Sequence, residues 1–231
     1  QVTERSPRRA TLGSMKGLPV DGRWRLFLAD VGQGGISRLI EWSLEIRAVT
    51  NLSALTLEFE DATIRSDGQD RAIEIPISIK GDLAIGGAAG TSLAGAVSGT
   101  GQLVKSGGGA LTLSGVNTFS GGIALEEGAL VLSNDRATGL GPISLKGGSL
   151  AAKGGARRLD NAVSLQGKLT FASGDRLELA GAVTFTGTSP LQVENETEIS
   201  GDIQESEPGA GFIKSGHGKL TCTLDSCRQY G

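Results

Sequence analysis

The sequence is poor in aromatic residues, histidine and cysteine, and it has no long apolar run. Aromatic residues make up 4% of the 231 residues, and there is one His. Without about 18 consecutive apolar residues, no membrane-spanning helix is predicted. The 22 basic and 25 acidic residues nearly balance, which argues against a nucleic-acid partner. The two cysteines lie together near the C-terminal end, so no disulfide framework holds the body of the chain.

Glycine, by contrast, is abundant, with 37 residues. Short segments in which every second residue is apolar, such as 55–59, 73–79 and 111–113, are separated by Gly-rich turns. An apolar period of two predicts strands, and no helical period of 3.6 occurs. The sequence therefore predicts an all-β fold.

The strand pattern repeats within the chain. Residues 77–83 match residues 163–169 at an offset of 86, and residues 105–113 match residues 214–222 at an offset of 109. The second offset exceeds the first by the length of one β-solenoid coil, which is roughly 20 to 25 residues. Adding a coil only lengthens such a stack, so we predict on the order of eight coils over residues 52–225, joined by parallel pairing between coils.

Residues 99–132 resemble a known family. The string from Gly99 to Gly122, followed by a strand ending in Gly128-Ala129-Leu130, is similar to the autotransporter-associated β-strand repeat, also called the passenger-associated transport repeat. The motif positions in the first copy are Lys105, Gly107, Gly109, Leu111, Leu113, Gly115, Asn117, Phe119, Gly121 and Gly122. A second, shortened copy contains Lys214, Gly216, Gly218 and Leu220. We expect Asn117 to bond stacked backbone groups and Phe119 to pack beside it.

This resemblance implies a right-handed parallel β-helix in a secreted or surface-displayed bacterial protein. It also implies a partner, an outer-membrane translocator located downstream in the parent chain. Solenoid ends that lack a cap expose backbone groups and an apolar interior, so self-association through the ends is a further expectation.

A second resemblance concerns residues 21–46. They are similar to the end of a proprotein-convertase P domain, a β-sandwich found beside subtilisin-like proteases, and the matching core positions are Trp24, Leu26, Asp30, Trp42, Leu44 and Ile46. The predicted division of the chain is a polar lead-in over 1–16, two P-domain-like terminal strands over 17–49, solenoid repeats over 50–225 and an irregular tail over 226–231. The two strands are expected to cap the first coil.

The sequence offers no catalytic, metal or cofactor site. The only His, His217, replaces a turn glycine of the first repeat copy, so a Ser-His-Asp arrangement has no base. Cys222 and Cys227 are too few for a zinc site. Cys222 corresponds to the inward Leu113, which leaves a buried thiol or a local disulfide with Cys227 as alternatives, and export favours the disulfide.

Three functions remain open at this point. The first is a non-enzymatic stalk of an exported surface protein that supports secretion and display. The second is an adhesin module that binds an extracellular glycan or a host protein. Its candidates for sugar stacking are Phe119, Phe171, Phe185 and Phe212, with a place in the core as the alternative for most of them. The third is an accessory region of a secreted subtilisin-like protease or carbohydrate-active enzyme.

Overall fold

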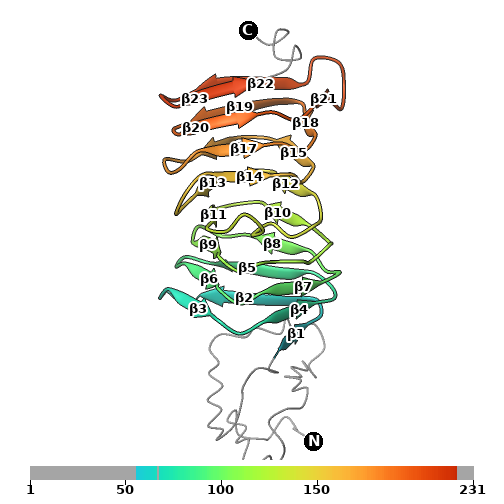
Figure 1. The fold of residues 1–231 in the computed structure, drawn as a ribbon, viewed down its shortest axis with the longest axis vertical. Coiled ribbons are helices and arrows are strands. Elements are labelled where there is room, and N and C mark those ends of the chain that lie inside the picture. Colours follow the sequence, from blue (N-terminus) through green and yellow to red (C-terminus); the bar gives the residue numbers. More distant parts are fainter. Residues whose placement is uncertain (1–55, 67, 223–231) are drawn as a thin grey trace, which may run out of the picture.

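The structure, a computed structural model, describes residues 56–66 and 68–222. These residues form 23 strands and no helix, and the strands are stacked in about eight turns of a β-solenoid (Figure 1). The prediction of an all-β solenoid is thereby confirmed. This part of the chain contains no helix long and apolar enough to cross a membrane.

Most coils place one strand on each of three faces, and all ladders between coils are parallel. The second face is an unbroken sheet of eight strands: β2 (Ala62–Ser66), β5 (Leu83–Gly87), β8 (Leu103–Lys105), β10 (Ile123–Leu125), β12 (Ile143–Leu145), β15 (Val163–Gln166), β18 (Val183–Thr186) and β21 (Ile203–Glu205). The third face is also unbroken: β3 (Arg71–Ile73), β6 (Thr91–Leu93), β9 (Ala110–Leu113), β11 (Ala129–Leu132), β13 (Ser149–Ala152), β16 (Leu169–Phe171), β19 (Thr188–Val193) and β22 (Gly211–Ser215).

The first face is interrupted. Its lower sheet comprises β1 (Leu57–Phe59), β4 (Ile77–Ile79) and β7 (Val97–Gly99), and its upper sheet comprises β14 (Arg157–Leu159), β17 (Leu177–Leu179), β20 (Glu196–Ile199) and β23 (Lys219–Cys222). Between them, segments 114–122 and 133–142 have no strand but continue the stack. For example, the N–H of Thr118 donates to Val97 in the coil below at 2.8 Å, and Leu140 donates to Phe119 at 2.8 Å.

The core consists of aliphatic side chains stacked in columns. On the second face, six inward residues lie in register from one coil to the next and are at most 2% exposed: Leu83, Leu103, Ile123, Ile143, Val163 and Val183. Burying each side chain contributes about 1.5–3 kcal/mol relative to leaving it exposed. Because the alternation places every second residue inward, the strand pattern of the sequence is the direct cause of this core.

The coil length is nearly constant along the stack. Over most of it, paired residues are separated by 20 in the sequence, as Ile77 is from Val97 and Leu103 from Ile123. The last coil is longer, since Leu191 pairs with Lys214 and Thr197 with Leu220, each at a separation of 23. The observed coils therefore have the predicted length, and the difference between the two repeat offsets corresponds to one coil.

Candidate functional site

The first repeat copy covers one and a half coils and forms a densely bonded segment of the stack. It runs from β8 through β9, the strandless segment 114–122 and β10 to β11. Leu111 and Leu113 on β9 are fully buried, and so is Phe119 in the strandless segment. Thr112, between the two leucines, points outward and is partly exposed. The apolar motif positions therefore face the core.

Lys105 ends β8 with its side chain turned into the corner toward β9. The residue is 1% exposed. Its ammonium group donates to the carbonyls of Ser106 at 2.7 Å, Gly107 at 2.6 Å and Glu127 at 3.0 Å. Three N–H donors thus meet three acceptors, one of them in the coil above. Burial lowers the pKa of the Lys105 ammonium, and the nearby Glu127 charge opposes that shift.

Gly128 lies directly over Lys105. Its φ of +80° is in the left-handed region that glycine adopts without strain. A Cβ atom there would lie 2.6 Å from Lys105 Nζ and would also meet the carbonyls of Gly107 and Gly109. The lysine corner therefore requires a glycine one coil above it.

Asn117 is the second polar motif residue, and it is 1% exposed. Its amide oxygen accepts the backbone N–H of Val97 at 2.8 Å, and its amide nitrogen donates to the carbonyl of Ala137 at 2.6 Å. The side chain thereby joins the coil below to the coil above at the point where the first face has no strand. A buried amide with both ends paired stabilises this stacking without an unpaired polar atom.

The motif glycines lie at corners where backbones approach closely. Gly107 has a φ of +69° and Gly122 a φ of +85°. Gly109, Gly115 and Gly121 have no left-handed φ, but a Cβ on any of them would collide with a carbonyl of the preceding coil. Their role is to let one coil lie directly on the next.

The second copy has the same local geometry on a different face. Lys214 donates to the carbonyl of Gly216 at 3.0 Å, as Lys105 does to Gly107, and Gly216 has a φ of +82°. However, Lys105 is on the second face, whereas Lys214 is on β22 of the third face and is exposed. Leu220 follows on β23 of the first face and is partly buried, and Gly218 donates to Val193 at 2.7 Å.

Cys222 packs against the core as a partly buried residue, in register with Ile199. It is disulfide-bonded. Cys227 lies outside the described residues, so the pairing of Cys222 with Cys227 stays a prediction.

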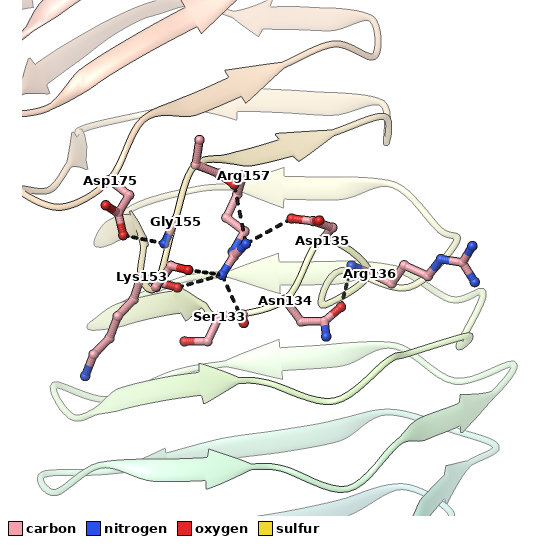
Figure 2. Close-up of polar contacts among 10 residues, drawn as sticks. Ser133, Asn134, Asp135, Arg136, Lys153, Gly155, Arg157 and Asp175 are labelled. Atoms are coloured by element: carbon pink, nitrogen blue, oxygen red, sulfur yellow. Dashed lines mark hydrogen bonds and ion pairs between the residues drawn. The ribbon is translucent and has the colours of Figure 1, made fainter.

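A polar cluster that the sequence analysis did not identify lies at the corner between the third and first faces (Figure 2). The Arg157 guanidinium forms an ion pair with Asp135 at 3.0 Å and donates to the carbonyls of Ser133 at 3.1 Å and Lys153 at 2.9 Å. One coil above, the Asp175 carboxylate accepts the N–H of Gly155 at 2.8 Å. Asp135, Gly155 and Asp175 recur at the coil period of 20, so the period itself could have revealed this column.

The outer side of the upper first face is a ladder of opposite charges. Arg158 on β14 pairs with Glu178 on β17, and Arg176 pairs with Glu198 on β20. Because the partners lie at the surface, each pair contributes little to stability.

Turn residue His217 is fully exposed, and its Nδ1 lies 3.9 Å from Glu194. Gln192 donates to Glu194 at 2.9 Å, and this bond lowers the pKa of the Glu194 carboxyl, with a smaller contribution from His217. Within residues 56–66 and 68–222, no three His, Cys, Asp or Glu side chains are grouped so that they could hold a metal ion.

Three of the four phenylalanines proposed for sugar stacking are fully buried: Phe119, Phe171 and Phe185. The fourth, Phe212, is partly buried and packs against Phe185 with ring centroids 5.2 Å apart. These rings belong to the core, so they do not form an aromatic stripe on an outer face. Of the two alternatives for these residues, the core is therefore correct for the buried three, and sugar stacking is wrong for them.

The stacked parallel sheets define the class of protein, a β-solenoid whose coils repeat at a separation of about 20 in the sequence. Within it, residues 103–132 match the family model of the passenger-associated-transport-repeat, so the resemblance drawn from the sequence is confirmed over the first copy. The repeat suggests an autotransporter passenger domain, and its family implies a secreted or surface-displayed bacterial protein. No curated protein and no solved structure matches the chain.

The P-domain-like positions, from Trp24 to Ile46, lie outside the described residues. The matched family covers none of them. That resemblance and the predicted capping role stay predictions.

Proposed function

We propose that this chain is a non-enzymatic stalk of an exported bacterial surface protein, which supports secretion through the outer-membrane translocator of its parent chain and then displays outer loops. The observation that supports this most is the transport repeat, whose polar residues bond one coil to the next. Lys105 bonds to Glu127 in the coil above, and Asn117 bonds to coils on both sides.

Coil-by-coil bonding suits this role for a physical reason. In a solenoid each coil contacts only its neighbours, so each added coil lengthens the folded stack without rearranging the rest. Folding outside the cell can therefore proceed as the chain emerges from the translocator, and the folded part resists movement of the chain back into the cell. In this proposed role the chain catalyses no reaction.

The test compares two substitutions on one strand, β9, in cells that produce the complete natural protein. Leu111→Asp places a charge in the core, because Leu111 is fully buried. Thr112→Asp, the matched control, places the same charge on the outer side, where Thr112 is partly exposed. The readout is the fraction of the protein at the cell surface or in the medium.

We expect Leu111→Asp to lower the exported fraction about tenfold or more, and Thr112→Asp to leave it near the native level. Equal exported fractions for the native protein and both variants would contradict the role of coil folding in export.

A further inference from the structure

The boundary between residues 134–141 and 154–161 on the first face differs from the boundaries below it. Below, neighbouring segments are joined by backbone bonds, such as Ser120 to Gly99 at 3.0 Å and Asn117 to Arg136 at 3.0 Å. Between the described residues 134–141 and 154–161, no bond joins two backbone groups.

Side chains replace the missing backbone ladder. The Asn161 amide donates to the carbonyls of Gly139 at 3.2 Å and Gly141 at 2.7 Å, and its oxygen accepts the Thr138 hydroxyl at 2.7 Å. At the other end of the boundary, Arg157 reaches down to Asp135 and to the Ser133 carbonyl.

Arg157 is held firmly at this position. Its side chain is 12% exposed. In addition to the contacts across the boundary, it donates to the carbonyls of Lys153 and Gly154 in its own coil, at 2.9 and 3.2 Å. Its Nε is buried without a partner. The guanidinium thus ties the turn after β13 to the coil below, as Figure 2 shows, at the cost of one unpaired donor.

The parallel ladder of the third face is also shortest at this boundary, where an isolated antiparallel bridge between Ala152 and Asp175 adds one further contact. β13 pairs with β16 over two residue pairs, Ser149 with Thr170 and Leu150 with Phe171. Every other strand pair among the described residues has at least three. At this level of the stack, the first face therefore has no backbone ladder and the third face has its shortest parallel ladder.

We propose that this level is a built-in joint that divides the solenoid into a lower unit, residues 56–152, and an upper unit, residues 153–222, with Arg157 and Asn161 setting how strongly the two units are coupled. Stability in a solenoid is a sum of coil terms and neighbour interfaces, so the weakest interface marks where a cooperative stack separates. In a stalk under mechanical force, the coils would separate first at this interface. The inference concerns folding alone and does not require the proposed role in export.

The test is amide hydrogen exchange, read peptide by peptide by mass spectrometry, on the complete chain. The double variant Arg157→Met with Asn161→Ala removes the side-chain bonds across the joint. The matched control is Arg158→Met, one residue along the same strand, whose side chain is exposed and pairs with Asp160 and Glu178.

In the native chain and the control, we expect both units to lose protection together. In the double variant, exchange rates in the two units should separate by at least about tenfold, because the units now open independently. Arg157→Lys, which keeps the charge but loses the fork of donors, should give a smaller separation.

Exchange rates that agree within about twofold between the two units of the double variant would overturn the proposal of a joint. A double variant that does not fold would overturn it as well, provided that Arg157→Lys folds and shows no separation between the units.

Discussion

The ammonium group of Lys105 donates to the backbone carbonyl of Glu127, 22 residues later, at 3.0 Å. One side chain thus closes its own corner and holds the corner of the coil above. This contact and the Asn117 bridge lie within the matched transport repeat, so their strength can be tested by substitution.

The first prediction concerns the stability that Lys105 provides. Lys105→Met keeps the apolar stem but leaves three carbonyls without their donor, so the free energy of unfolding should fall by about 3 kcal/mol. Lys146→Met is the control, because Lys146 is half-exposed and pairs with Glu126 at 3.4 Å, and it should cost less than about 1 kcal/mol. Urea unfolding of both variants measures the difference. Similar losses would show that the buried ammonium has no special role.

The second prediction follows from the lowered pKa of Lys105. Between that pKa and the ordinary lysine value of about 10.4, the unfolded chain binds more protons than the folded one, so stability rises with pH. The excess stability of the native protein over Lys105→Met should therefore be constant near neutral pH and grow in the alkaline range. Unfolding curves for both proteins from neutral pH to about pH 10 test this. A decrease would mean that the three carbonyls favour the charged form more than burial disfavours it.

The third prediction concerns the Asn117 bridge. Asn117→Ala leaves the Val97 N–H and the Ala137 carbonyl unpaired inside the stack, so we expect a loss of about 2–4 kcal/mol. Asn134→Ala removes one local bond to the Arg136 N–H in a partly exposed turn and should cost less than about 1 kcal/mol. Thermal or urea unfolding gives both values. If the two variants were equally stable, the bridge between coils would contribute nothing.

The fourth prediction concerns the glycine above Lys105. Gly128→Ala forces a side chain into left-handed backbone and against Lys105 Nζ, so it should cost about 2–4 kcal/mol. Gly108→Ala, in the turn below, meets no atom within 4 Å and should be neutral or stabilising by up to about 1 kcal/mol. Urea unfolding of the two variants compares them. If the Gly128→Ala variant were as stable as the native protein, the corner at Lys105 would accommodate the added methyl group without a loss of stability.

The offsets between repeats led to the right architecture although the copies are not equivalent. Residue 77 lies on the first face, and its match, residue 163, lies on the second. Residue 105 lies on the second face, and residue 214 lies on the third. In both matches, the second copy therefore lies one face further along the coil than the first copy. Because this extra step is the same in both offsets, subtracting one offset from the other removes it. The difference that remains between the two offsets is one coil. The repeated unit is one strand with its corner, and a coil contains three such units, so two copies of the unit can lie on different faces.

Other features depended on information that the repeat motif does not contain. The motif indicated that Asn117 is structural, because an inward or turn asparagine in a solenoid can bond stacked backbone groups. Arg157 gave no such signal, since Arg157 and Arg158 are neighbours of identical type. Only the backbone direction decides that Arg157 turns into the corner while Arg158 turns to solvent.

The central claim, an exported solenoid stalk, is tested most directly by labelling intact cells with a membrane-impermeant maleimide. Leu140→Cys places a thiol at a position that is 72% exposed, and Leu125→Cys places one at a position that is fully buried. We predict that Leu140→Cys is labelled on intact cells and that Leu125→Cys is labelled only after denaturation. Labelling of Leu140→Cys only after the cells are broken would contradict surface display, and equal labelling of both thiols on intact cells would contradict the folded solenoid.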